Sequence, residues 1–346
     1  MKKIFTIILA MLLISCSKEE QRVGQTEFVL NVEVDQTSSQ TKGVITDTEF
    51  GPNETIGLFV YYGEEKKIPH ENLALYGENY RNVKATRATS VDSPGKWKFN
   101  FNGTLGDFYN FYLMSPSTEL FGKGLTVYAY SPWISGAQSI DDIYFTLGGN
   151  KYDLVDLMYA KQNMTEENAC LDHEKKPDGS DKVPVNLTFK HALSLIEFKL
   201  KCAHPTSTMT LYSVTLSQKG ETPLYNSGSF NALTNKFTLT DDNKGDITSY
   251  YHYNGMTDEF TKDGRSYFTT IIPTQEDYIN ESYEVSFNMN GHDLVYKYKI
   301  KADDLAYGKF EPGKKYVFNF TFDNYIQLQN VSVSDDWSND EINIKF

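Results

Sequence analysis

The sequence predicts an all-β protein built of β-sandwiches, and three observations support this class. Many short segments alternate apolar and polar residues with a period of two, which is typical of half-buried strands. Aromatic residues make up 14% of the 346-residue chain, with 24 Tyr and 22 Phe, and these side chains favour pleated surfaces. No long stretch keeps the 3.6-residue apolar period of a helix. Many short strands separated by turn signals are typical of sandwiches.

The first predicted strand covers residues 26–34. Its apolar residues Phe28, Leu30, Val32 and Val34 fall on one face, and the other face is mostly polar. A polar loop at residues 35–43 (DQTSSQTKG) bounds the strand. The same alternation predicts further strands at Ile56–Tyr62, Trp97–Phe101, Leu125–Tyr130, Asp142–Leu147, Leu157–Lys161, Val185–Phe189, Leu195–Leu200, Met209–Leu216, Lys236–Thr240 and Tyr267–Ile272.

The clearest hairpin spans Tyr283–Ile300. Apolar residues alternate on both sides of Asn290-Gly291, a pair that supplies the positive φ angles of a tight turn. A further strand, Tyr316–Phe322, follows the turn signal Pro312-Gly313.

The amino terminus is a targeting segment and takes no part in the fold. Residues 1–16 place two lysines before an apolar run that is too short to span a bilayer and has the proportions of a signal-peptide core. The run ends in Leu13-Ile14-Ser15-Cys16, which resembles the bacterial lipobox and predicts acylation of Cys16. The alternative is an ordinary secretory signal with an incidental cysteine. Residues 17–25 then form a tether, whose Lys18-Glu19-Glu20 either resembles an outer-surface export signal or is simply solvated.

A polar stretch near the middle of the chain predicts a domain boundary. Residues 173–182 (HEKKPDGSDK) contain a proline, a glycine and almost no apolar side chain. We therefore expect an N-terminal sandwich over residues 26–172 and a C-terminal sandwich over residues 183–346.

The cysteine count and the net charge limit the class of protein. Three cysteines exclude a disulfide scaffold. In an oxidising compartment Cys170 and Cys202 either form a single disulfide or remain free thiols, and the sequence leaves both alternatives open. The formal net charge of -13 argues against nucleic acid or an anionic membrane surface as the main partner.

Several segments, spread over the whole chain, together resemble the fimbrillin family, the pilins of type V pili. After the leader they are IGLFV at 56–60, DLMYA at 156–160, VNLTFKHALS at 185–194, PGKKY at 312–316 and VSVSDDW at 331–337. The third segment, a strand followed by His191-Ala192-Leu193 and a second strand, is the most specific. The resemblance implies two transthyretin-like β-sandwich domains in tandem. It also implies a subunit of a pilus assembled by strand exchange, or a tip or anchor role in the same fibres.

The resemblance implies how such a subunit would assemble. In that family a trypsin-like protease cuts the loop after the first strand, the strand leaves, and the C-terminal strand of another subunit fills its place. Here the basic residue of that loop is Lys42, whereas stalk pilins are usually cut after arginine, so Lys42 is either the cleavage site or an ordinary loop lysine. Without cleavage the protein would be a tip, an anchor or a monomeric surface protein. The candidate donor residues are Ile326, Leu328, Val331, Val333, Ile342, Ile344 and Phe346.

The implied partners follow from the same resemblance. They are other pilin subunits, the processing protease, outer-membrane lipid reached through the acylated Cys16, and a host protein or glycan receptor. The expected location is the cell surface and its fimbriae, anchored by lipid to the outer membrane.

No enzyme motif is present, so we expect no catalytic residue, cofactor or metal. His191 has no second His or Cys at ligand spacing and is predicted to be a structural turn histidine bonded to the backbone. Asp241–Asp246 resembles a calcium loop with its Gly displaced, and we interpret it as a turn. Tyr128, Tyr130 and Trp133 are expected to pack, with stacking on sugars as the alternative. The second functional hypothesis is a monomeric glycan-binding or adhesin lipoprotein on the same scaffold, and an enzyme is the third.

Overall fold

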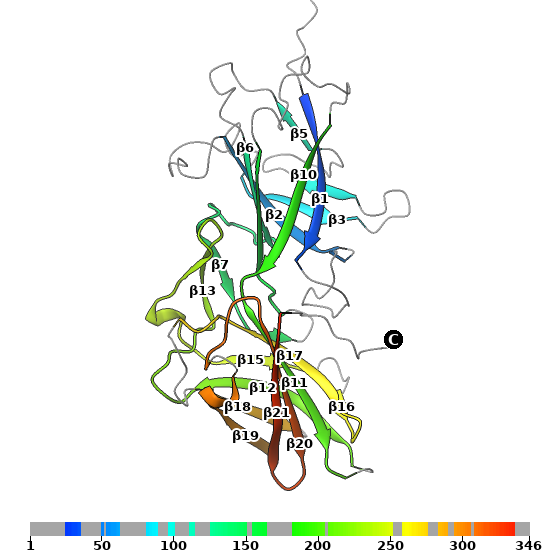
Figure 1. Cartoon of the computed structure of the whole chain (residues 1–346), viewed down its shortest axis with the longest axis vertical. Coiled ribbons are helices and arrows are strands. Elements are labelled where there is room, and N and C mark those ends of the chain that lie inside the picture. The colour runs from blue at the N-terminus through cyan, green and yellow to red at the C-terminus, as the bar shows by residue number, and fades with distance from the viewer. Residues whose placement is uncertain are drawn as a thin grey trace, which may run out of the picture.

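The structure is a computed structural model, and its described parts consist of strands, loops and two short 3-10 turns (Figure 1). The described residues are 25–35, 50–51, 53–62, 81–88, 96–100, 111–114, 125–150, 154–164, 182–204, 207–251, 258–275, 283–289, 294–305 and 308–335. The two turns are η4 (Asp241–Asn243) and η6 (Ala302–Asp304). None of the described helical segments is long and apolar enough to cross a membrane. The predicted all-β class is confirmed.

An eight-stranded sheet forms the upper part of the molecule in Figure 1, in the order β4-β3-β2-β6-β9-β10-β1-β5. Within this sheet β1 and β10 run parallel, and the other neighbours run antiparallel. Its strands are β1 (Gln25–Val34), β2 (Thr55–Tyr62), β3 (Val83–Arg87), β4 (Trp97–Asn100), β5 (Phe111–Met114), β6 (Leu125–Ser131), β9 (Met158–Met164) and β10 (Lys182–His191).

This sheet curls over itself and encloses one hydrophobic core. Val32 and Val34 of β1 belong to the same buried cluster as Trp97 and Phe99 of β4, although these strands lie near opposite ends of the strand order. A flat sheet would keep them far apart, so the sheet must bend until its ends share a core.

The opposite face of the curled sheet also packs. Phe59, Tyr128 and Tyr130 are fully buried there and belong to a second cluster. Gly57 makes room for this packing, because a Cβ at that position would lie 2.1 Å from Cε1 of its cross-strand partner Tyr130. The first sheet therefore has one core on its inner face and a shared core on its outer face.

The lower part of Figure 1 holds the remaining sheets. A four-stranded sheet has the order β17-β11-β20-β21, a six-stranded sheet includes β19-β18-β12-β15-β8 with β16 beside β12, and a three-stranded sheet has the order β14-β13-β7. Their strands are β7 (Ile143–Thr146), β8 (Gly149–Asn150), β11 (Ser194–Cys202), β12 (Met209–Gln218), β13 (Ser227–Asn231), β14 (Lys236–Thr238), β15 (Ile247–Tyr250), β16 (Asp258–Phe260), β17 (Arg265–Ile271), β18 (Tyr283–Met289), β19 (Leu294–Ile300), β20 (Lys315–Phe322) and β21 (Ile326–Ser334).

The four- and six-stranded sheets pack face to face as a sandwich. Phe198 of β11 meets Phe287 of β18 edge to face, with ring centroids 5.3 Å apart, and Phe287 makes a similar contact with Phe320 of β20. All three side chains are at most 1% exposed. Edge-to-face rings of this kind are favourable packing partners in a core.

The chain passes from the curled sheet to the sandwich between β10 and β11. Two strands of the first half of the chain join sheets of the second half: β7 pairs with β13, and β8 pairs with β15. The limits of the predicted domains, 26–172 and 183–346, remain a prediction.

Most strands expected from alternation are present. The hairpin of β18 and β19 is confirmed, with Tyr283 opposite Ile300 and Met289 opposite Leu294, while Asn290-Gly291 lies outside the described residues. The sequence analysis missed six strands, which are β3, β5, β8, β13, β15 and β16.

Candidate functional site

The candidate site is the position that β1 occupies between β10 and β5. Residues 27–34 lie in register against 182–189 of β10, and residues 25–28 lie against 111–114 of β5. Val32 and Val34 are 8% and 5% exposed and belong to the core of the curled sheet, and Leu30 is half-buried against it. The side chain of Phe28 lies outside the described residues. The predicted first strand is therefore confirmed as a strand of the core, rather than a loose ribbon on the surface.

β10 provides the apolar side chains against which β1 packs. Leu30, Val32 and Val34 stand directly opposite Val185, Leu187 and Phe189. These three residues of β10 are at most 1% exposed while β1 is in place. Withdrawal of β1 would bring them into contact with water, together with the backbone groups that now pair with β1.

The outer face of the same strand pair is polar. The Asn31 side-chain amide donates a hydrogen bond to Oδ1 of Asn186, its cross-strand partner, at 2.8 Å. The backbone N–H of Asn186 donates to Oε1 of Gln162 on β9. Lys190 and Asp35 lie 4.0 Å apart with both side chains more than half exposed, a geometry that contributes little to stability.

Several predicted site residues lie outside the described residues. They are the acylation site Cys16, the tether 17–25, the cleavage candidate Lys42, the disulfide candidate Cys170, and the donor candidates Ile342, Ile344 and Phe346. Each of these assignments remains a prediction.

The other four donor candidates lie on β21, at the end of the four-stranded sheet. Ile326, Leu328, Val331 and Val333 are half-buried and pack against the sandwich core. Among the described strands β21 pairs with β20 alone, and a bulge at Gln329 lets apolar residues on both sides of it face the core. In this structure β21 is a bound edge strand, and its role as a donor remains a prediction.

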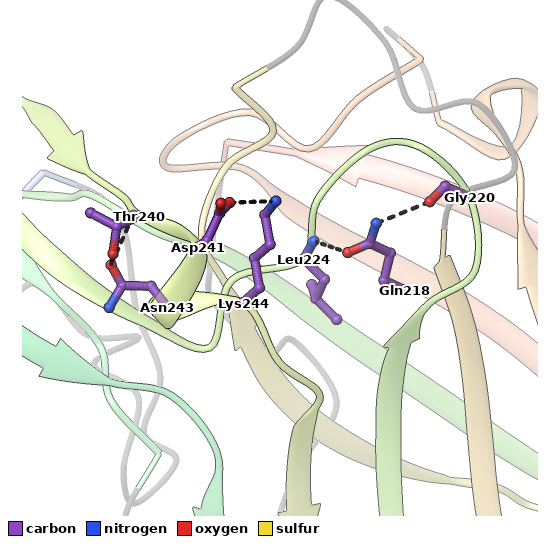
Figure 2. A network of polar contacts seen from close by, with 7 residues as sticks. All are labelled: Gln218, Gly220, Leu224, Thr240, Asp241, Asn243 and Lys244. Carbon is purple, nitrogen blue, oxygen red and sulfur yellow. Dashed lines mark hydrogen bonds and ion pairs between the residues drawn. The ribbon is translucent and has the colours of Figure 1, made fainter.

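The loop with the calcium-like sequence forms a capped turn (Figure 2). Oδ1 of Asn243 accepts hydrogen bonds from the backbone N–H and the hydroxyl of Thr240, at 2.9 and 3.1 Å. Asp241 pairs with Lys244 at 2.7 Å, and the hydrogen bond lowers the pKa of the Asp241 carboxyl. Oδ1 of Asn243 and a carboxylate oxygen of Asp241 are thus engaged within the turn, in agreement with its interpretation as a turn.

His191 is buried at the end of β10, which agrees with a structural role. Its Nδ1 lies 2.9 Å from Oδ1 of Asp156, and both side chains are 3% exposed. This nitrogen contacts a carboxylate, which the sequence analysis did not anticipate. The adjacent carboxylate could not be predicted, because Asp156 lies 35 positions earlier in the chain.

The aromatic candidates pack, as expected. Tyr128 and Tyr130 are fully buried. Trp133 is half-buried, donates from its indole N–H to the carbonyl of Asn82 at 3.2 Å, and lies under the ammonium of Lys84 at 4.7 Å. This ring is held by its neighbours.

Cys202 is buried, with its Sγ 3.4 Å from the carbonyl oxygen of Phe260, and burial raises the pKa of its thiol. Among the residues that the structure describes, no group of three His, Cys, Asp or Glu side chains could hold a metal ion.

One charged pair was missed by the sequence analysis. Glu197 of β11 is 1% exposed and lies 2.9 Å from Nζ of Lys315 on β20, whose side chain is 6% exposed. Glu197 also accepts a hydrogen bond from the hydroxyl of Ser266 on β17. The alternation Leu195, Glu197, Lys199 predicts a solvent face, and nothing local in the sequence indicates that this face is covered.

The chain is similar to one protein family in sequence and to solved structures in fold. A family model described as fimbrillin-like matches residues 41–337. No curated protein sequence matches the chain. A proposed cell adhesion protein from Bacteroides ovatus shares 16% identity and a TM-score of 0.54, with 91% of this chain and 98% of that chain covered. A second one, from Bacteroides uniformis, shares 15% identity and a TM-score of 0.53 over the same shares. At these identities the two structures show likeness of fold alone.

Proposed function

The chain belongs to the fimbrillin-like family, and from that premise we propose that it is a structural or adhesive subunit of a type V pilus. A fimbrial or adhesion role follows from membership of the family. The proposal adds that the protein is exported as a lipoprotein acylated at Cys16, and that subunits assemble by donor-strand exchange after the first strand has been removed.

The observation that supports strand exchange is the packing of β1. The strand begins the described chain, fills a position between two other strands, and covers three buried side chains of β10. Burial of Leu30, Val32 and Val34 contributes about 4–7 kcal/mol, at about 1.5–3 kcal/mol per fully buried side chain with Leu30 counted as half. A strand held so firmly does not leave unless another strand of the same pattern takes its place.

The remaining steps use residues of the predicted processing loop and of the C-terminal region. A trypsin-like protease cuts after Lys42, which frees β1 from the rest of the chain. A strand from a second copy, drawn from Ile326–Val333 or from Ile342–Phe346, then occupies the vacated position. The acylated Cys16 holds the uncut subunit on outer-membrane lipid at the cell surface until cleavage, and a host protein or glycan is the target of the finished fibre.

Limited proteolysis of the full-length protein, solubilised in detergent, tests this proposal. We expect trypsin to remove the chain up to Lys42, to leave Gly43 as the new N-terminus, and to convert monomers into a ladder of oligomers on native gels. Lys42→Gln is the matched control, and it should remain uncut in this loop and monomeric. A protein that is cut after Lys42, loses β1 and still runs as a monomer would exclude strand exchange.

A second candidate, a glycan-binding surface lipoprotein, is favoured by one observation. Tyr250 on the outer face of the six-stranded sheet is 51% exposed and stands opposite Ser213. In the next row the hydroxyls of Thr215 and Thr248 lie 3.0 Å apart. An exposed ring beside hydroxyl groups suits stacking on a sugar. Under this hypothesis Tyr250→Ala abolishes binding to a glycan array, whereas under the pilin hypothesis it leaves oligomer formation after trypsin unchanged.

A further inference from the structure

The two faces of the β1–β10 strand pair differ in how strongly they fix the alignment of the two strands. The inner face is apolar and repeats every two residues, with Val185, Leu187 and Phe189 on β10. Among the described side chains, the outer face carries the hydrogen bond of 2.8 Å from the Asn31 amide to Asn186, beside the exposed pair of Lys190 and Asp35.

The apolar repeat alone does not fix where an incoming strand stops. A slip of one residue would turn all of its apolar side chains outward, so the repeat excludes it. A slip of two residues keeps every apolar side chain on the inner face and costs far less. A polar pair on the outer face distinguishes these two-residue registers, because a slip leaves each amide opposite a different side chain.

A second cross-strand pair of asparagines is present in the sandwich. Between β20 and β21 the Asn319 amide donates to Oδ1 of Asn330 at 2.7 Å, and these residues are cross-strand partners beside the bulge. Two strand pairs, β1 with β10 and β20 with β21, therefore each carry an asparagine opposite an asparagine.

The C-terminal sequence repeats the side-chain order of β1. Residues 30–34 read Leu-Asn-Val-Glu-Val, and residues 342–346 read Ile-Asn-Ile-Lys-Phe. Both have the order apolar, Asn, apolar, charged, apolar. β21 also contains Asn330 followed by Val331, but its residue before the asparagine is Gln329, which would place an amide at the half-buried position of Leu30.

We propose that Asn186 sets the register of the strand that replaces β1, and that it pairs with Asn343 of a second copy of this chain. In that register Ile342 and Ile344 take the places of Leu30 and Val32, and Lys345 stands opposite Thr188. This inference rests on the proposed function, and it adds which segment exchanges, in which direction and at which position.

Cross-linking with a short bis-maleimide tests the register while leaving both asparagines intact. The full-length protein carries Cys170→Ser to limit background and is cut after Lys42. Cysteine pairs between two copies then report the arrangement: Thr188→Cys with Lys345→Cys for the proposed register, Lys190→Cys with Lys345→Cys for a two-residue slip, and Thr188→Cys with Glu341→Cys for an antiparallel strand. We expect the first pair to dominate.

A second measurement asks whether Asn186 causes that preference. A cross-strand pair contributes about 0.2–1 kcal/mol, so Asn186→Ala should lower the ratio of in-register to slipped product by up to about fivefold. Asn319→Ala removes the matching pair of the sandwich and serves as the control, which should leave the ratio unchanged.

The outcomes separate this inference from the proposed function. Oligomers that cross-link equally in both registers, or a ratio unaffected by Asn186→Ala, would overturn the inference that Asn186 sets the register. Strand exchange itself would stand. Oligomers without any cross-link to residue 341 or 345 would point to β21 as the donor and would also overturn the inference. If the cut protein with unaltered cysteines forms no oligomers at all, the proposed function fails and the inference fails with it.

Discussion

Replacement of Val32 by threonine tests whether core burial is what holds β1 in its position. Val32→Thr keeps the β-branched shape and exchanges one methyl group for a hydroxyl. Val32 is 8% exposed and stands opposite Leu187, and the other members of its core cluster are hydrophobic. Burying a hydroxyl among apolar side chains costs about 1–3 kcal/mol in proteins.

The cost should be visible in two measurements. In the uncut protein it lowers the free energy of unfolding by that amount. After cleavage at Lys42 the same contacts hold β1 as a separate peptide, and a loss of about 1–3 kcal/mol corresponds to release roughly five- to 160-fold faster. The release is followed by size-exclusion chromatography of the cut protein, with mass spectrometry to count the remaining β1 peptide.

Glu33→Thr is the matched control, because it introduces the same side chain on the same strand at an exposed position. We expect its release rate to stay within about twofold of the unaltered protein, since exposed substitutions usually change stability by less than about 0.5 kcal/mol. If Val32→Thr and Glu33→Thr release β1 equally fast, core burial does not hold the strand and this explanation is wrong.

Three further predictions concern the fold. Gly57→Ala should lower the unfolding free energy by about 1–3 kcal/mol in urea, because its Cβ would lie 2.1 Å from Cε1 of the buried Tyr130; an unchanged midpoint would refute the close approach. Glu197→Gln should lower the unfolding free energy by about 3–5 kcal/mol, because it leaves the buried ammonium of Lys315 opposite a neutral amide. A loss below about 1 kcal/mol would contradict the importance of this ion pair. Burial raises the pKa of Tyr130 to about 12 from 10.0, so the native state keeps a proton that the unfolded chain loses, and stability should be full below pH 10 and fall as the pH rises towards 12. Tyr130→Phe should remove this residue's share of the loss, which is measured as the change in unfolding free energy between pH 9 and pH 11, and an equal change in both proteins would speak against a buried Tyr130.

The sequence predicts the strands best where alternation is strong and long. β1, β18 and β20 alternate apolar residues over most of their length, and each is present where the pattern puts it. β13, with the sequence Ser-Gly-Ser-Phe-Asn, carries one large apolar residue and was missed, because its neighbours β7 and β14 supply the packing that its own composition does not indicate.

The candidate site was predicted in part. The apolar face of β1 follows from periodicity, but its parallel partner does not, because Asn31 and Asn186 are 155 positions apart and no local pattern joins them. The burial of Glu197 was missed for a related reason: a charged residue at an alternate position predicts a solvent face, and only the neighbouring strands decide whether that face is covered.

Under the proposed function, the position of β1 gives a physical reason why cleavage, rather than simple unfolding of the strand, would start assembly. While the chain is continuous, β1 is covalently joined to the strands that it pairs with, so its effective concentration at its position stays high. A donor strand from another copy, present at a much lower concentration, cannot compete with it even if its contacts are equally good. A cut after Lys42 removes that advantage without altering any contact of Val32 or Val34, so the two strands then compete on affinity alone. The uncut Lys42→Gln protein should accordingly resist exchange even when excess donor peptide is added, whereas the cut protein should accept it.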